Sequence, residues 1–243
     1  MGRAIVITGG SRGIGRAAAL QAGARGWSVA VNYVRDAAAA KEVVAGIAKA
    51  GGRAIAVQGD VAEEADVLRL FDAAETAFGP LSGVVVNSGV VAPPSRLADM
   101  DLARLRHMFD INLLGAMLTA REGARRLTQG GSIVLVSSAA ARLGGPNEYV
   151  DYAASKGALD TLAIGLSKEL GPQGIRVNSI RPGLIETDIH ASGGQPDRAQ
   201  RLGTSAPLGR PGRADEVGEA IVWLLSDAAS YVTGSIMDVT GGR

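Results

Sequence analysis

Short apolar runs alternate with longer helical patterns along the whole chain, and this alternation most restricts the folds that the chain can adopt. We expect strands at 4–8, 28–33, 54–58, 83–87, 132–137, 175–180 and 235–239. The runs at 84–86 and 133–136 have no polar side, which is typical of parallel strands covered by helices on both faces. The sequence therefore predicts an α/β fold with a doubly wound parallel sheet of about seven strands.

The chain shows no sign of division into several domains. Its 243 residues, 47% of them hydrophobic, are enough to bury one large core. No proline-rich or charge-rich linker interrupts the pattern, and no internal repeat is visible. We therefore expect a single domain over residues 1–243.

A glycine-rich turn follows the first apolar run. The segment Thr8-Gly9-Gly10-Ser11-Arg12-Gly13-Ile14-Gly15 leads directly into an alanine-rich helical pattern. Glycines let a phosphate approach the backbone, and the free N–H groups and positive dipole of a helix start attract it. The pattern indicates a diphosphate site, although its spacing is G-x-x-x-G-x-G and a tight connection alone is the alternative.

Tyr152 and Lys156 are four residues apart, and Ser138 precedes them. On a helix, positions i and i+4 share one face, so the ammonium is expected within a few Å of the phenol. A neighbouring cation favours phenolate and lowers the pKa of a tyrosine. We interpret the pair as a general acid and base acting on a carbinol oxygen that Ser138 holds, with a chance spacing as the alternative.

Composition excludes several other functions. A formal net charge of +1 gives no strong field for nucleic acid, and we expect Arg121, Arg125 and Arg126 to form a solvated helical face. No apolar run has the length of a membrane helix and no leader is visible, so we expect a cytoplasmic protein without membrane attachment. With no cysteine, and with only His107 and His190, no metal site is expected.

Taken together, these motifs resemble the short-chain dehydrogenase/reductase family over nearly the whole chain. The resemblance also rests on Asp60-Val61, Asn87-Ser88-Gly89, Asn112, Pro182-Gly183 followed by Thr187, and the final Gly241-Gly242. It implies a Rossmann fold, a nicotinamide cofactor and assembly into a homotetramer through the helices near 99–127 and 150–170 and the last strand.

The resemblance also implies a role for individual residues. The catalytic residues are expected to be Asn112, Ser138, Tyr152 and Lys156. The cofactor contacts are expected at Gly9, Ser11, Arg12, Gly13, Ile14, Gly15, Asn32, Tyr33, Arg35, Asp60, Val61, Asn87, Gly89, Tyr152, Lys156, Pro182, Gly183, Ile185 and Thr187.

The end of the second predicted strand bears on the choice of cofactor. Enzymes that use NAD commonly place an acidic residue there against the ribose 2′-hydroxyl. This chain has Asn32-Tyr33 instead, with Arg12 and Arg35 nearby. Guanidinium groups suit the charge of a 2′-phosphate, so we expect NADP(H) in preference to NAD(H); ordinary surface arginines are the alternative.

The activity implied is hydride transfer between nicotinamide and a carbonyl or secondary alcohol, with Tyr152 moving the proton. A ketone or 3-oxoacyl reductase is the central hypothesis. A sugar or alcohol dehydrogenase working in the oxidative direction is one alternative, and a non-catalytic NADP-binding sensor or scaffold is another. The Gly- and Pro-containing segment 188–213 is predicted to be a mobile substrate-binding lid, and such loops set specificity.

Overall fold

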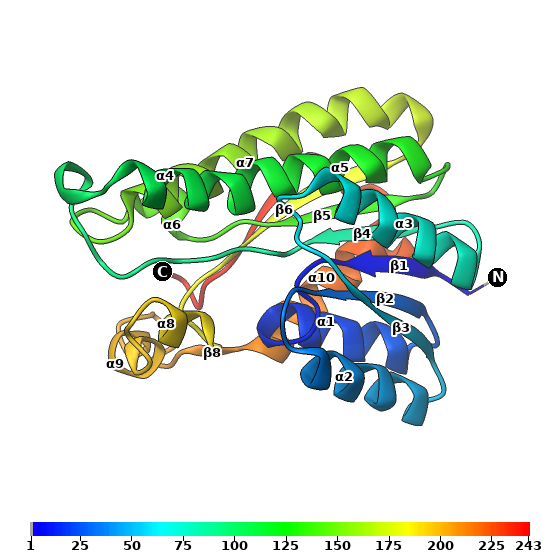
Figure 1. Cartoon of the computed structure of the whole chain (residues 1–243), viewed down its shortest axis with the longest axis horizontal. Helices are drawn as coiled ribbons and strands as arrows, with labels where there is room; N and C mark the ends of the chain where they lie inside the picture. Colours follow the sequence, from blue (N-terminus) through cyan, green and yellow to red (C-terminus); the bar gives the residue numbers. More distant parts are fainter. Residues whose placement is uncertain (1) are drawn as a thin grey trace.

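A seven-stranded sheet in which every strand is parallel forms the centre of the computed structural model, which describes residues 2–243 (Figure 1). The spatial order of the strands is β3-β2-β1-β4-β5-β6-β9. Their bounds are β1 Ala4–Ile7, β2 Ser28–Tyr33, β3 Arg53–Gln58, β4 Gly83–Val86, β5 Ser132–Val136, β6 Arg176–Pro182 and β9 Ile236–Val239. The predicted doubly wound sheet is therefore confirmed, with all seven strands in the expected places.

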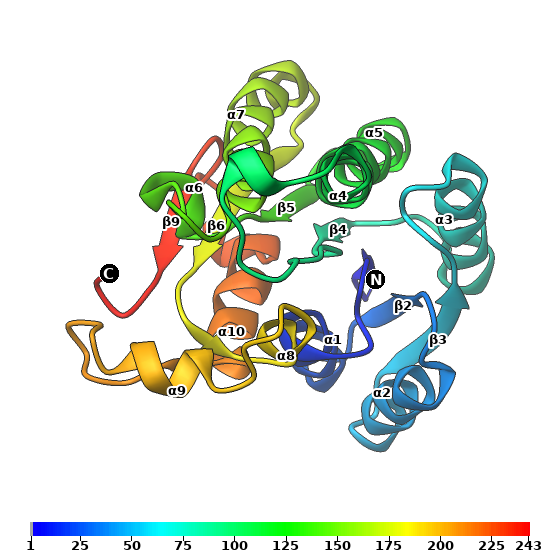
Figure 2. The ribbon, with the colours of Figure 1, turned by 60° about the vertical axis from the view of Figure 1, so that its left-hand side comes forward.

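Helices cover both faces of the sheet, and Figure 2 shows α3, α5 and α7 on one side and α1, α2 and α10 on the other. The long helices are α1 Gly13–Ala24, α2 Ala37–Lys49, α3 Glu64–Phe78, α4 Leu102–Phe109, α5 Gly115–Arg126, α7 Val150–Leu170 and α10 Ala214–Leu225. The short ones are α6 Ala140–Leu143, α8 Ile189–Ser192 and α9 Arg198–Gly203, with single 3₁₀ turns at Leu97–Asp99, Gly171–Gln173 and Asp227–Ala229.

The central strands are buried on both sides because successive side chains of a strand point to opposite faces. Val84 and Val86 of β4 pack into the core beneath α3, α5 and α7, whereas Val85 packs into the core above α1 and α10. β5 divides in the same way, with every residue buried. The wholly apolar runs in the sequence thus reflect two separate cores on one sheet.

The order of the strands places a crevice between β1 and β4. The chain runs outward from β1 to β2 and β3, then returns to pair β4 with the other side of β1. Ligands of open α/β sheets bind where the strand order reverses, outside the carboxyl ends of the strands. The glycine turn after β1 and the segment after β4 lie at this point.

A π-helical turn, Asp110–Leu114, interrupts the predicted helix and joins α4 to α5. Such turns insert one extra residue into a helix and are frequent at functional sites. Asn112 lies in this turn and is fully buried. The helical pattern of the sequence does not by itself reveal this change of register.

The segment 188–213 contains α8 and α9 and lies beyond the carboxyl ends of the main strands (Figure 1). A second sheet closes its base, because β7 Ile185–Glu186 pairs in parallel with β8 Gly212–Arg213. Strands of two residues leave no periodic signal, and the sequence analysis did not predict this pair. The segment thus has its own local structure and is tied to the end of β6.

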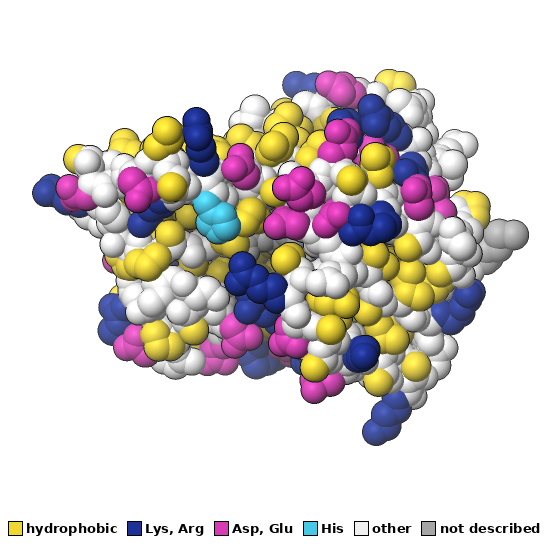
Figure 3. Space-filling model, viewed as in Figure 1, with side chains coloured by type: hydrophobic (Ala, Val, Ile, Leu, Met, Phe, Trp, Pro, Cys, Tyr) yellow, Lys and Arg dark blue, Asp and Glu magenta, His cyan; other side chains and the backbone are white. Residues whose placement is uncertain are grey.

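Charged side chains of both signs are interspersed over the face shown in Figure 3. The three arginines expected on a solvated face of α5 are engaged in ion pairs: Arg121 with Glu64, Arg125 with Glu122, and Arg126 with Asp72 and Glu75. Within residues 2–243, no helix is both long enough and apolar enough to cross a membrane.

Candidate active site

The turn between β1 and α1 is shaped by its glycines. Gly9 and Gly13 have φ angles of 61° and 54°, in the left-handed region that glycine favours. A Cβ on Gly15 would lie 2.4 Å from the carbonyl oxygen of Gly9, so no larger residue fits there. α1 begins at Gly13 without a side-chain cap. Its first N–H groups are therefore available to a phosphate, and the turn fits a dinucleotide diphosphate.

Two asparagines hold this turn in place. Asn87, after β4, donates from Nδ2 to the carbonyl oxygens of Thr8 and Gly9 at 2.9 and 3.1 Å. Asn32, at the end of β2, accepts from the Gly9 N–H at 3.2 Å and donates to the Gly59 carbonyl at 2.8 Å. Asn32 was predicted to contact the cofactor, but its side chain is buried and fully engaged in these internal bonds. Its role in the structure is to brace the turn.

The residues predicted for the adenosine end of the cofactor lie around β2 and β3. Arg12 and Arg35 are both exposed, and neither forms an ion pair with any part of the chain between residues 2 and 243. Asp36 is close in sequence, but its carboxylate caps α2 by accepting from the Ala39 N–H at 2.9 Å. No carboxylate therefore occupies the end of β2 itself, and two cations are available beside it.

Asp60 and Val61 follow β3, and their side chains differ in role. An Asp60 carboxylate oxygen accepts from the Ala62 N–H at 3.0 Å, which shapes the loop. Val61 is buried against the first residue of α5, where a Cβ on Gly115 would lie 2.7 Å from Val61 Cγ2. Val61 therefore joins the loop to the core, and Tyr33 lies half-buried at the end of β2.

Ser138, Tyr152 and Lys156 meet at the carboxyl end of β5. Ser138 is two residues beyond β5, and α7 carries Tyr152 and Lys156 on its first two turns. The buried Ser137 fixes the two elements together by donating to the Lys156 carbonyl at 2.9 Å. The Ser138 hydroxyl lies near enough to the Tyr152 phenol to lower its pKa, and it accepts from the Ala140 N–H at 3.1 Å. The structure thus brings together the predicted serine, tyrosine and lysine.

Electrostatics at this site differ from the sequence-based expectation. Burial raises the pKa of Tyr152, and the hydrogen bond from Ser138 opposes that rise. Burial also lowers the pKa of Lys156 to about 8, against the attraction of Asp160. Lys156 Nζ lies 5.7 Å from the centroid of the Tyr152 ring and donates to the Val136 carbonyl at 2.8 Å. The expected lowering of the Tyr152 pKa by Lys156 is therefore not present here.

Asn112 connects the π turn to the segment after β4. Its Oδ1 accepts from the Val90 N–H at 2.7 Å, and its Nδ2 donates to the Val90 carbonyl at 2.9 Å and approaches Ser155 Oγ at 3.2 Å. The π turn, with its one extra residue, directs the Asn112 side-chain amide toward Val90 and α7, where it forms these long-range hydrogen bonds. A Cβ on Gly89 would lie 3.2 Å from Lys156 Nζ and 3.3 Å from Asn112 Oδ1. Gly89 therefore lies between the two predicted catalytic residues.

The segment after β6 approaches the glycine turn from the opposite side. A Cβ on Gly13 would lie 3.4 Å from the methyl group of Thr187, so the two segments are in near contact. Gly183 packs against the last residues of the chain, where a Cβ would lie 2.8 Å from Thr240 Cα. Pro182 and Ile185 are buried. Thr187 therefore lies beside the turn, and its predicted contact with the cofactor stays a prediction.

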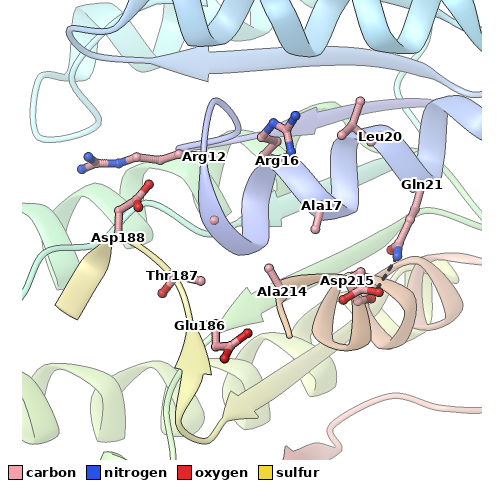
Figure 4. Close-up of a pocket in the computed structure, with 11 residues that line it drawn as sticks. Arg12, Arg16, Ala17, Leu20, Gln21, Glu186, Thr187, Asp188, Ala214 and Asp215 are labelled. Atoms are coloured by element: carbon pink, nitrogen blue, oxygen red, sulfur yellow. Dashed lines mark hydrogen bonds between the residues drawn. The ribbon is translucent and has the colours of Figure 1, made fainter. Parts of the chain in front are cut away.

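A cleft of about 440 Å³ separates the start of α1 from the segment after β7 and from α10 (Figure 4). Arg12 and Arg16 come from one wall, and Glu186, Thr187 and Asp188 from the facing one. The cleft borders the glycine turn but does not include the serine, tyrosine and lysine. A second, mostly apolar hollow of about 320 Å³ lies between 90–94 and α4.

Sequence reasoning missed several residues that support the site. Thr8 is fully buried, and its hydroxyl accepts from the N–H groups of Asn87 and Ser88 at 2.9 and 3.1 Å. Its place directly before the glycine turn was a usable signal. Asp151 and Arg104 form a buried ion pair beside Tyr152, and no local pattern links residues that are 47 positions apart. Within residues 2–243, no group of three or more His, Cys, Asp or Glu residues is arranged to hold a metal.

Comparisons with known proteins agree with this geometry. A family model described as enoyl-(acyl carrier protein) reductase matches residues 9–243. The chain is 49% identical to the uncharacterized oxidoreductase YgfF of Escherichia coli over 98% of each chain. It is 37% identical to the NADPH-dependent aldehyde reductase-like chloroplastic protein of Arabidopsis thaliana, over 99% of this chain and 94% of that relative.

Solved structures of related proteins have the same fold as this chain. A short-chain dehydrogenase from Burkholderia cenocepacia in complex with NADP superimposes with a TM-score of 0.93 at 33% identity, covering 100% of this chain and 98% of that one. The parallel sheet, the glycine turn and the serine–tyrosine–lysine group are therefore found in a chain whose relatives are oxidoreductases. The protein belongs to the short-chain dehydrogenase/reductase family.

Proposed function

We propose that this protein is an NADPH-dependent carbonyl reductase that acts on a small ketone or 3-oxoacyl compound. The observation that carries the proposal is the convergence of Ser138, Tyr152 and Lys156 at the carboxyl end of β5, beside a glycine turn that fits a dinucleotide. A binding module needs no serine, tyrosine and lysine gathered at one strand end. The alternative of a sensor or scaffold is therefore less well supported.

The mechanism follows from what these side chains can donate. The nicotinamide cofactor, when bound, supplies a hydride to the carbonyl carbon. Tyr152 gives its phenolic proton to the carbonyl oxygen, which becomes the hydroxyl of the product, and takes a proton back from solvent before the next turnover. Ser138 donates a hydrogen bond to the same oxygen and stabilises its developing negative charge. Oxidation of an alcohol is the reverse of these steps.

Lys156 and Asn112 support the proton transfer. Lys156, whose Nζ lies 5.7 Å from the centroid of the Tyr152 ring, returns a proton to Tyr152 after the phenol has released its own. Asn112 and Lys156 lie on either side of Gly89, which keeps the space between them open. We assign to Asn112 the role of holding the π turn and the path by which Lys156 exchanges protons with solvent. Lys156 would also bind the ribose of the nicotinamide.

The preference for NADP(H) is supported by the charges around β2. Arg12 and Arg35 are exposed cations, and the nearest acid, Asp36, is engaged in capping α2. A 2′-phosphate would therefore meet two guanidinium groups without an opposing carboxylate at the strand end. The solved relative that holds NADP and the relative named NADPH-dependent agree with this preference.

The arginines of the segment 188–213 favour a free small substrate over one linked to a carrier protein. A protein carrier would be recruited by unpaired basic side chains around the pocket. Each of the four instead lies within 4 Å of an acidic partner: Arg198 of Glu148, Arg201 of Asp197, Arg210 of Glu216 and Arg213 of Asp215. A free ketone is therefore the better-supported substrate within the proposed class.

We also propose that the protein assembles as a homotetramer. Large apolar side chains are exposed on the outer faces of α4, α5 and α7: Leu102, Met117 and Ile164 are 61%, 47% and 39% exposed. Burying such side chains between copies is favourable. Light scattering should give four times the mass of the chain, and a monomer mass would reject the assembly.

The proposed activity can be tested by following NADPH oxidation with a panel of ketones, diketones, keto esters, keto sugars and 3-oxoacyl thioesters. Wild-type protein should turn over at least one class. Tyr152→Phe should lose turnover and still bind NADPH, whereas Tyr231→Phe, at a fully exposed tyrosine, should match wild type. Tight NADPH binding without turnover of any carbonyl would instead favour the sensor. Equal affinity for NADH and NADPH would reject the cofactor preference.

A further inference from the structure

The helix that carries Tyr152 begins in an unusual way. α7 starts at Val150, and its N-cap residue, Tyr149, makes no side-chain cap. The first four N–H groups of a helix have no partner within the helix, and that of Tyr152 is one of them. The Asp151 side chain supplies the missing acceptor, because its Oδ1 accepts from the Tyr152 N–H at 2.9 Å. The backbone of the proposed acid is thus fixed by the carboxylate of its neighbour.

That carboxylate is in turn held by an arginine on another helix. The Asp151 side chain is fully buried, and its Oδ2 lies 2.9 Å from Arg104 Nε. A second nitrogen of the same guanidinium lies 3.3 Å from Asp151 Oδ1. This two-point contact fixes the direction as well as the position of the carboxylate. The Arg104 side chain is itself only 16% exposed.

Arg104 also reaches the segment that follows β4. Its remaining terminal nitrogen donates to the carbonyl oxygen of Pro93 at 2.6 Å. The Arg104 backbone N–H is held by the Asp101 carboxylate at 2.7 Å, which caps the start of α4. One guanidinium therefore joins three elements: α4, the segment 90–94 and the start of α7.

We propose that Arg104 is a positioning residue for catalysis, which acts through Asp151 to hold the Tyr152 phenol in position beside Ser138. This inference rests on the proposed role of Tyr152 as the proton donor. The segment 90–94 is fixed at one end by Asn112, through Val90, and at the other by Arg104, through Pro93. Both ends of the segment 90–94 are thus held by α4 and its continuation.

The chemistry of the pair requires an arginine. Lysine carries the same charge but has a single nitrogen, which cannot bind both carboxylate oxygens and the Pro93 carbonyl at once. Methionine fills a similar volume but leaves the buried Asp151 without its cationic partner. Arg104→Lys therefore preserves the positive charge but loses the two-point contact with Asp151. Arg104→Met loses both the charge and the contact.

The test compares Arg104→Lys and Arg104→Met with wild type and with Arg25→Met. Arg25 pairs with Glu219 between α1 and α10, where both side chains are substantially exposed. It thus provides an arginine–carboxylate pair between two helices away from the proposed site. The kcat is calculated per NADPH-binding site, so that unfolded protein is not counted as enzyme. The exchange of the Tyr152 amide hydrogen is measured in parallel, because it reports on the Asp151 contact without any turnover.

Both Arg104 variants are expected to lower kcat by about 10- to 100-fold, since a misplacement of about 1 Å has an effect of this size. In both variants the NADPH affinity should remain within about twofold of wild type, and the Tyr152 amide hydrogen should exchange faster. Arg25→Met should match wild type in kcat, NADPH affinity and amide exchange. Wild-type kcat per site or wild-type amide exchange in Arg104→Lys and Arg104→Met would overturn the positioning role. Absence of Tyr152-dependent turnover in wild type would reject the proposed function instead, and the amide exchange would still decide the positioning.

Discussion

The ammonium of Lys156 donates a hydrogen bond to the carbonyl oxygen of Val136, 2.8 Å away at the end of β5. This contact satisfies one of the three ammonium donors in a position from which water is largely excluded. Burial lowers the pKa of Lys156 to about 8, although the charge of Asp160 opposes the change. The lysine thus loses its proton around pH 8, whereas burial keeps the Tyr152 phenol protonated to higher pH.

Lys156 is therefore expected to make stability depend on pH in a defined window. Below pH 8 the lysine is charged in both states, and the folded protein bears the full cost of burying the charge. Between about 8 and 10.5 the unfolded chain keeps a proton that the folded protein has lost, so stability rises with pH. Lys156→Met should therefore gain stability over wild type by more at pH 7 than at pH 9.5. An equal difference in urea unfolding at both pH values would contradict the lowered pKa.

Gly15→Ala should remove cofactor binding and destabilise the fold. Its new methyl group would lie 2.4 Å from the Gly9 carbonyl oxygen and 2.6 Å from Asn87 Nδ2, so the turn must open. We expect a loss of about 1–3 kcal/mol in unfolding free energy from this overpacking. Gly165→Ala is the matched control, because nothing lies within 4 Å of its added Cβ on α7. That variant should gain about 0.5–1 kcal/mol, and calorimetry with NADPH titration measures both effects.

Asn112→Asp should disrupt the π turn with almost no change in side-chain shape. It replaces the amide that donates to the Val90 carbonyl at 2.9 Å with an oxygen that repels it. A loss of about 1–3 kcal/mol is expected, together with reduced turnover. Asn147→Asp is the control, since Asn147 is exposed and its φ of 63° suits both residues. Equal effects of the two changes on urea unfolding would refute the importance of the Asn112 contacts.

Arg198 is expected to hold the segment 188–213 against the residues that precede α7. Its guanidinium donates to Glu148 at 2.6 Å, to Gln195 at 3.0 Å, and lies 4.8 Å from the centroid of the Tyr149 ring. Arg198→Met should raise the KM for the carbonyl substrate about tenfold, the scale of a lost charge-assisted hydrogen bond. Proteolysis within 188–213 should also become faster.

Arg210→Met tests whether that effect is specific to the Arg198 contacts. Arg210 lies in the same segment and pairs with Glu216, with about half of its side chain exposed. Arg210→Met should change neither the KM nor the rate of proteolysis by more than about twofold, because exposed ion pairs contribute little to stability. If both variants behave alike, Arg198 has no special role in holding the segment.

Local pattern was sufficient to predict the layered architecture and the places of the main site residues. The run 133–136 contains only apolar side chains, which predicts a strand covered by helices on both faces. β5 is buried throughout, as this pattern predicts. Tyr152 and Lys156 needed only a helix between them to share a face, and α7 supplies it. Such inferences depend on neighbours in the chain, whose geometry is set by backbone periodicity alone.

Contacts between distant segments decided the rest. Asn32 is predicted from its position to contact the cofactor, yet Gly9 and Gly59 engage its side chain. Asn112 of the π turn meets Val90, 22 residues away in the chain, and Arg104 meets Asp151 only after α4 and α7 have packed together. The pKa of Tyr152 is likewise set by burial and Ser138 more than by the lysine one turn away. Sequence alone determined which residues reach the carboxyl edge of the sheet. Only the tertiary structure decided their partners and proton affinities, because desolvation and hydrogen bonding depend on which groups surround each atom in space.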